Sequence, residues 1–148
     1  MWFGGKTYVA RRLNQLSVLA ALLALALGNG LTLILNDFIA RDRPFVSNDL
    51  FLLFYQPTDP SFPSNPAVLG FAIAGSIWKY NRSLGTVLFA VSAIWSFSRI
   101  FAGVCYPSDI LVGAAIGISA AYTARYALKI FSPVTNRTIR IMENLYLA

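Results

Sequence analysis

The sequence predicts an all-α integral membrane bundle of about four transmembrane helices, and three observations support this. The composition is 57% hydrophobic and only 12% charged, about half the charge that a soluble domain carries. Residues 13–36 contain no charged side chain, and more than about 18 such residues can cross the hydrocarbon layer of a bilayer. At 148 residues the chain is too short for two domains, so we expect one membrane domain covering 1–148.

The first apolar run is expected to be a transmembrane helix that follows a short N-terminal segment, 1–12. A signal peptide is the alternative, because Arg11 and Arg12 precede the run and resemble a positively charged n-region. The apolar core of a signal peptide is only about 7 to 15 residues long. The run is longer than that, so we predict that this helix is retained.

Three further uncharged, apolar stretches predict three more helices, at 60–78, 83–98 and 110–124. The last two are shorter than the roughly 20 residues that span a bilayer. Arg99 and Asp109 must then lie near one interface, while Arg125 and Lys129 extend to the other. A tight turn at 81–85 joins the second and third stretches. With the first run these stretches define a predicted four-helix core, 13–131.

The two remaining segments are expected at the membrane surface. The loop 40–64 is rich in Pro, Asp and Ser, and its apolar patch at 50–55 predicts a short interfacial helix. The tail, 132–148, carries Ile139 and Met142 at helical spacing beside Arg137 and Arg140. This pattern predicts an amphipathic surface helix.

Lysine and arginine bias predicts the orientation, because cytoplasmic loops are enriched in these residues. Four crossings place both termini and the 79–85 turn on one side of the membrane. Nine of the twelve basic residues lie on that side: Lys6, Arg11, Arg12, Lys79, Arg82, Arg125, Lys129, Arg137 and Arg140. We therefore expect cytoplasmic termini and an outward-facing loop 40–64. This bias accounts for the net charge of +6, so no nucleic-acid partner is expected.

The cysteine and histidine counts limit the chemistry. A single cysteine, Cys105, excludes an intramolecular disulfide and a cysteine metal cluster. The sequence has no histidine, which removes both the commonest general base and the commonest metal ligand. We expect no metal and no cofactor.

Four segments are predicted to meet at the outer face: 36–44, 63–67, 98–99 and 105–109. Helix N-termini offer unpaired N–H groups and a positive dipole to an anion, and Ser64 adds a hydroxyl. Arg43 and Arg99 are suited to bidentate binding of phosphate oxygens. The pattern predicts a site for the phosphate group of a molecule whose tail stays in the bilayer.

Three motifs lie in these segments. Asn36 stands seven residues before Arg43-Pro44, Pro63-Ser64-Asn65-Pro66 follows, and Ser98-Arg99 precedes Cys105 and Asp109 at fixed spacing. They resemble the K-x6-R-P, P-S-G-H and S-R-x5-H-x3-D motifs of the type 2 phosphatidic acid phosphatase family. The stretches RDRPFVSNDLFLLFYQPTDPSFPSNPA and SRIFAGVCYPSDILVGAAIG resemble its bacterial undecaprenyl-diphosphate phosphatase branch. The resemblance covers about 28–121 and implies the membrane core of that family, in a bacterial inner or plasma membrane.

The resemblance also implies roles for individual residues. In the family the third-motif histidine attacks phosphorus, the aspartate orients it, and the second-motif histidine protonates the leaving group. By position these roles fall on Cys105, Asp109 and Pro66. The phosphate-binding positions are Asn36, Arg43, Ser64, Asn65, Ser98 and Arg99. Pro66 has no proton to donate, and Asn36 lacks the charge of the family lysine.

Cys105 has two interpretations. A thiolate can attack phosphorus, and the start of a helix and Arg99 would stabilise its negative charge. Asp109 lies one helical turn away, and its charge opposes a thiolate. The alternative is that Cys105 is a small apolar residue that fills space.

Two classes of function follow. Loss of both histidines and the lysine favours a catalytically impaired pseudoenzyme, which binds a polyprenyl (di)phosphate or a phospholipid headgroup or serves as a structural subunit with other membrane proteins. The alternative is an active undecaprenyl-diphosphate phosphatase that uses Cys105. Vanadium haloperoxidase chemistry is excluded because it requires the histidine that binds vanadate.

Overall fold

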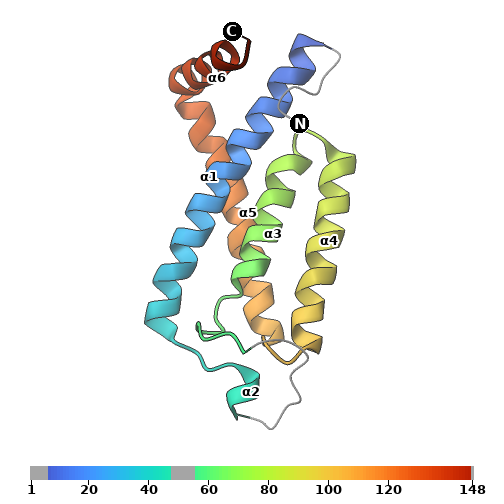
Figure 1. Cartoon of the computed structure of the whole chain (residues 1–148), viewed down its shortest axis with the longest axis vertical. Coiled ribbons are helices and arrows are strands. Elements are labelled where there is room, and N and C mark those ends of the chain that lie inside the picture. Colours follow the sequence, from blue (N-terminus) through green and yellow to red (C-terminus); the bar gives the residue numbers. More distant parts are fainter. Residues whose placement is uncertain (1–6, 48–55, 148) are drawn as a thin grey trace.

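The computed structural model describes residues 7–47 and 56–147, and the regular secondary structure within them is entirely helical. The helices are α1 (Tyr8–Ile39), α2 (Pro44–Ser47), α3 (Asn65–Trp78), α4 (Arg82–Phe101), α5 (Pro107–Ile130) and α6 (Ser132–Leu147). Helices α1, α3, α4 and α5 run side by side, and α3 packs against the other three (Figure 1). The predicted all-α membrane bundle is confirmed.

The predicted count of four complete crossings is not confirmed. By length and composition, the described part of the chain has three helices able to cross a membrane, at α1, α4 and α5. Helix α3 is apolar but has only 14 residues. At 1.5 Å per residue it is about 21 Å long, against about 30 Å for the hydrocarbon layer. Four full crossings are therefore not established.

Proline explains why α3 begins later than the apolar pattern indicates. The stretch was predicted from 60, but the helix begins at Asn65, with Ser64 as its N-cap and Pro66 in its first turn. Pro60 and Pro63 lack N–H donors, and each restricts the residue before it to extended conformations. Residues 56–64 therefore form an irregular segment that leads into α3.

The other boundaries extend the predicted helices or fall outside the description. Helix α5 continues to Ile130, past the predicted end at 124. The 81–85 turn is shorter than predicted, since Asn81 caps α4 through a bond from the Leu84 N–H (3.0 Å). The tail is helical, as expected, at α6. The apolar patch at 50–55 lies outside the described residues.

Small residues allow α3 and α5 to approach closely. Gly113 and Gly117 lie four residues apart on α5 and are both buried. A Cβ built at Gly113 would lie 2.7 Å from the carbonyl oxygen of Ser64, and one at Gly117 would overlap the carbonyl oxygen of Val68. Small residues at this spacing are typical of membrane helices whose backbones touch. The contact fixes the start of α5 against the start of α3.

The bundle has two ends (Figure 1), and the residues at them differ. We call one the motif end; it comprises residues 40–47, 56–66 and 99–109, including α2. We call the other the basic end; it comprises the start of α1, the turn at 79–81 and the junction between α5 and α6. The predicted phosphate site lies at the motif end.

Candidate functional site

A cavity of about 290 Å³ lies at the motif end. It is lined by Arg43, the 59–66 segment, two residues of α4 and the residue that precedes α5 by two positions. The lining side chains are Arg43, Asp59, Pro60, Ser61, Pro63, Ser64, Asn65, Pro66, Trp95, Arg99 and Cys105. The cavity thus contains residues from all three motifs.

Arg43 is buried, with 5% of its surface exposed, and is held by several partners. Its Nε donates to the carbonyl oxygen of Asp59 (2.8 Å), and Nη1 donates to that of Val104 (2.9 Å). Its Nη2 forms an ion pair with the Asp59 carboxylate (2.9 Å), which is largely exposed. The guanidinium is therefore fixed in place while its counter-charge remains in contact with solvent.

Arg99 comes from the last turn of α4 and lines the same cavity. Its Nε is buried and has no hydrogen-bond partner among the described residues. A buried donor without a partner costs about 1 to 3 kcal/mol, and more when the group is charged. An anion in the cavity would remove that cost.

Cys105 and Ser64 lie next to each other in the cavity lining. The thiol sulfur lies 3.9 Å from the Ser64 hydroxyl and 3.8 Å from Arg43 Nη1, and both side chains are buried. Ser64 is held at the start of α3 because its N–H donates to the carbonyl oxygen of Asp109 (3.1 Å). The buried Oδ1 of Asn65 has no partner among the residues described. The thiol and hydroxyl are thus placed beside a fixed arginine.

Asp109 occupies a different position from the one expected. It is fully buried and does not line the cavity. Its carboxylate pairs with Arg41 Nη1 (2.7 Å) and accepts bonds from the Ser61 hydroxyl and the Tyr106 N–H (3.1 Å). Arg41 also stacks over the Tyr106 ring, 4.0 Å from its centre. Asp109 therefore ties the loop after α1 to the start of α5.

The expected convergence is accordingly only partial. We expected both Arg43 and Arg99 to point toward Ser64 and Asp109. The cavity brings Arg43, Arg99 and Ser64 together, but the carboxylate of Asp109 is engaged by Arg41 instead.

Two predicted phosphate-binding residues lie outside the cavity. Ser98 is exposed, and its hydroxyl donates to the carbonyl oxygen of Trp95 (2.7 Å). Neighbouring helical residues point in different directions, so Arg99 can line the cavity while Ser98 cannot. Asn36 lies near the end of α1, where its carbonyl oxygen accepts the capping N–H of Ala40. Its side-chain oxygen is buried without a partner in the described chain.

Sequence reasoning did not identify three residues that shape this end: Arg41, Asp59 and Ser61. None occupies a position of the three motifs. Arg41 and Asp59 are charged residues of the predicted outer loop. Their charge, close to the first two motifs, was the one sequence signal that could have pointed to them. Ser61 has no sequence signal, since serines are common in loops.

Comparison with known proteins agrees with the motifs. The model of the PAP2 superfamily matches residues 17–131. The chain is 30% identical over 101 residues to the undecaprenyl-diphosphatase BcrC of Bacillus subtilis, covering 68% of this chain and 52% of that protein. It is 29% identical over 109 residues to the bacitracin transport permease protein BcrC of Bacillus licheniformis, covering 73% and 54%.

A solved structure is also similar. The crystal structure of LpxE from Aquifex aeolicus matches with a TM-score of 0.67 and 32% identity, covering 73% of this chain and 66% of that one. The chain spans about half the length of the curated relatives it matches.

Proposed function

The chain belongs to the PAP2 superfamily, and from that premise we propose that it binds the phosphate group of a membrane lipid at the motif end without hydrolysing it by the family route. The observation that carries this is the buried, unpartnered Nε of Arg99 in a cavity shared with Arg43 and Ser64. Arg99 and Ser64 supply hydrogen-bond donors to one small space, and Arg43, whose N–H groups are bonded to carbonyl oxygens and to Asp59, adds positive charge. Such a space suits a phosphate.

The absence of a proton donor argues against efficient hydrolysis. Pro66 stands at the position where the resemblance implies the general acid, and proline has neither a titratable group nor an N–H. General acid catalysis typically contributes about 10² to 10⁴ in rate. The sequence has no histidine to replace it. We therefore favour a lipid-binding function over hydrolysis.

The relatives suggest the class of lipid. The Bacillus subtilis relative is an undecaprenyl-diphosphatase, so a polyprenyl diphosphate or monophosphate is the ligand we propose for this chain. A phospholipid phosphate offers the same chemistry to the two arginines. The cavity volume of about 290 Å³ suits a headgroup, with the tail remaining in the bilayer.

A second candidate function is hydrolysis with Cys105 as nucleophile, and the surroundings of the thiol favour it. The sulfur lies near Arg43 and Ser64, while the charge of Asp109 is balanced by Arg41. The thiolate would form an S–P bond to the terminal phosphorus as the P–O bond to the lipid phosphate breaks. Water would then cleave the S–P bond and release inorganic phosphate.

Loss of the general acid constrains this second reaction. When the substrate is a lipid monophosphate, the lipid alcohol is the leaving group, and it must receive a proton because an alkoxide is a poor leaving group. When the substrate is a lipid diphosphate, the leaving group is the lipid monophosphate. Its second pKa is about 6, as for related phosphoesters, so it departs as a stable anion without a proton. An active protein should consequently prefer diphosphates to monophosphates.

Lipid binding tests the proposal. Purified protein in neutral detergent should bind undecaprenyl monophosphate and diphosphate, and Arg99→Gln should weaken binding about tenfold or more, since a charge-assisted bond is lost. Arg137→Gln is the matched control, because it removes the same charge from an exposed position on α6 that lines neither cavity. Equal weakening by both changes would show nonspecific attraction and contradict the site.

Phosphate release separates the two candidates. The unmodified protein, incubated with undecaprenyl diphosphate, should release no more phosphate than Cys105→Ala. Release that exceeds this control, and that stops when the thiol is alkylated, would replace the binding function with the Cys105 reaction.

We also propose that the motif end faces outward and that both termini are cytoplasmic, because nine of the twelve basic residues fall on the other side in the predicted topology. Single cysteines at Thr58 and Ser83, in a Cys105→Ser background, test this. Both positions are exposed, and Ser83 avoids Asn81, which caps α4. An impermeant thiol reagent should label only Thr58→Cys in intact cells; labelling only Ser83→Cys would reverse the orientation.

A further inference from the structure

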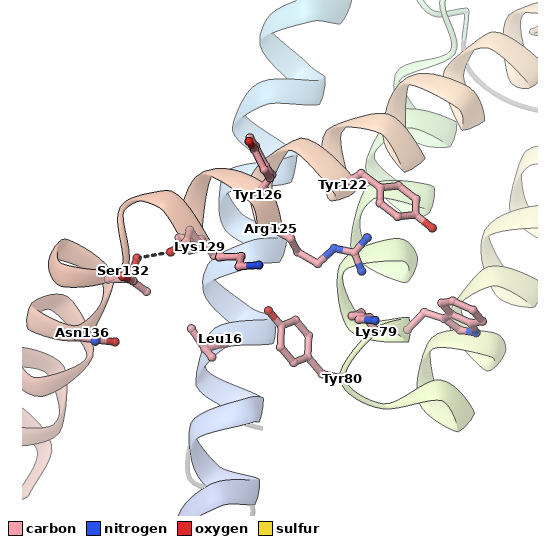
Figure 2. Close-up of a pocket in the computed structure, with 12 residues that line it drawn as sticks. Leu16, Lys79, Tyr80, Tyr122, Arg125, Tyr126, Lys129, Ser132 and Asn136 are labelled. Carbon is pink, nitrogen blue, oxygen red and sulfur yellow. Dashed lines mark hydrogen bonds between the residues drawn. The ribbon is translucent and has the colours of Figure 1, made fainter.

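A second cavity, larger than the one at the motif end, lies at the basic end. Its volume is about 830 Å³, and it lies between α5, the turn at 79–81, the start of α6 and Leu16 of α1. Figure 2 shows Arg125 and Lys129 extending from α5 toward Lys79 and Tyr80 on the turn. Three cations from two separate elements thus share one hollow.

These cations lack counter-charges. Lys79, Arg125 and Lys129 make no ion pair with the side chains that the structure describes, those of residues 7–46 and 56–141. Arg125 and Lys129 stand four residues apart on one helix, where like charges repel. The positive-inside rule explains why basic residues lie on one side of a membrane, but it does not explain why three of them converge on one cavity. An anion bound among them would.

Neighbouring aromatic residues leave the cations able to bind. The guanidinium of Arg125 lies over the Tyr122 ring, 4.3 Å from its centre. Stacking uses the face of the guanidinium and leaves its N–H edge free to donate to phosphate oxygens. Tyr80 adds a phenol, and burial raises its pKa, although the charge of Arg125 acts in the opposite direction. The phenol is therefore protonated at neutral pH and is a hydrogen-bond donor.

We propose that this cavity is a second anion site, which binds the phosphate of an anionic phospholipid headgroup through Lys79, Arg125, Lys129 and Tyr80. Basic pockets between transmembrane helices are known to bind acidic headgroups. The aromatic side chains of Tyr122 and Tyr126 line the same cavity and are largely exposed, as is typical of residues at a lipid interface. This site is independent of the proposed function, since it shares no residue with the motif end.

Native mass spectrometry can test the site. Protein in neutral detergent is titrated with phosphatidylglycerol and, separately, with phosphatidylcholine. Phosphatidylglycerol should bind with the higher affinity, and Arg125→Gln/Lys129→Gln should weaken it about tenfold or more because two charge-assisted bonds are lost. The control is Arg137→Gln/Arg140→Gln, which removes two charges from exposed positions on α6 and should change affinity less than threefold.

A third titration, with inorganic phosphate, identifies the source of the anion. Loss of one bound phosphate in the cavity variant, with no loss in the control, supports the site and assigns it to a soluble ligand. Equal weakening in the two double variants, or no preference for phosphatidylglycerol, overturns the proposal. If the cavity variant does not fold, Lys79→Gln, at an exposed turn position, and Arg125→Lys/Lys129→Arg provide the test. The first should weaken binding and the second should retain it.

Discussion

The motif end and the basic end are both rich in arginine or lysine, but the positive side chains have different partners at the two ends. At the motif end Arg43 is buried and bonded to carbonyl oxygens and Asp59, and Arg41 is paired with the buried Asp109. At the basic end Lys79, Arg125 and Lys129 line a larger cavity, and none of them pairs with a carboxylate among the side chains of 7–46 and 56–141. Arg43 and Arg41 of the motif end are held by bonds to other residues before any ligand arrives. Of the three cations at the basic end, Arg125 is held by stacking on Tyr122.

The difference indicates two kinds of recognition. A fixed guanidinium selects a ligand by geometry, because its donors have set directions. Flexible lysines and a stacked arginine around a large hollow select by charge and accept varied headgroups. The motif end should therefore be sensitive to single substitutions, and the basic end to the total charge.

The largest effect is expected from rebuilding catalysis at the motif end. Cys105→His/Pro66→His should raise hydrolysis of undecaprenyl diphosphate about 10² to 10⁴ times above either single variant, since a general acid contributes that much and catalytic groups act as a unit. Phosphate release is the measurement, and Asn36→Lys on top should raise it further. Adding Arg99→Gln should abolish the gain. A double variant no better than its singles would mean that the cavity lacks the catalytic geometry.

Next in size is the effect of the buried carboxylate. Asp109→Asn should lower the free energy of unfolding by about 2 to 3 kcal/mol, because Arg41 loses its ionic partner and the amide N–H2 group, a donor, replaces one of the two oxygens that accept from Arg41, Ser61 and Tyr106. Asp59→Asn is the control, and its cost should stay below about 1 kcal/mol, since the Asp59 side chain is 60% exposed. Thermal unfolding in detergent gives both values; equal losses would contradict the structural role of Asp109.

The helix contact that joins the two ends should also be sensitive. Gly117→Ala places a Cβ against the backbone of α3, which cannot move aside easily, and should destabilise the protein by about 1 to 3 kcal/mol. Gly30→Ala is its counterpart, because nothing lies within 4 Å of a Cβ there. That change should be neutral or stabilising, since alanine favours helix more than glycine does. Melting temperatures that fall equally would argue against the close α3 to α5 contact.

The smallest effect concerns pH at the basic end. Burial raises the pKa of Tyr80, only partly opposed by Arg125, so folding favours the neutral phenol. This contribution to stability is complete below the unfolded pKa of about 10 and is lost as the pH rises through the folded pKa. Melting temperature should therefore fall less steeply above about pH 10 in Tyr80→Phe than in the unmodified protein. Identical slopes would exclude the burial effect.

The fold and part of the site could be predicted from the sequence for definite reasons. The uncharged runs predicted the helices. The motif spacing predicted that Arg43, Ser64, Arg99 and Cys105 lie close together, and all four line one cavity. The pairing of Arg41 with Asp109 joins residues 68 positions apart, and no periodicity reports which of several loop arginines reaches a carboxylate. Exposure of Ser98 depends on the rotation of α4, which a motif does not specify. The convergence of Lys79, Arg125 and Lys129 on one cavity depends on the geometry of the 79–81 turn. From the sequence these residues indicate only a bias of positive charge to one side of the membrane.

The shortness of α3 has a consequence for access to the motif end. If its turn at 79–81 lies level with one surface of the hydrocarbon layer, a helix of 14 residues ends about 9 Å before the other surface. Ser64 and the cavity would then lie below the plane of the headgroups, in a zone where the bilayer must thin or the polar lining must draw water inward. A lipid phosphate would reach the arginines by sinking slightly and moving sideways within its leaflet. Entry would then depend on local membrane thickness, so bilayers of shorter acyl chains should load the site faster.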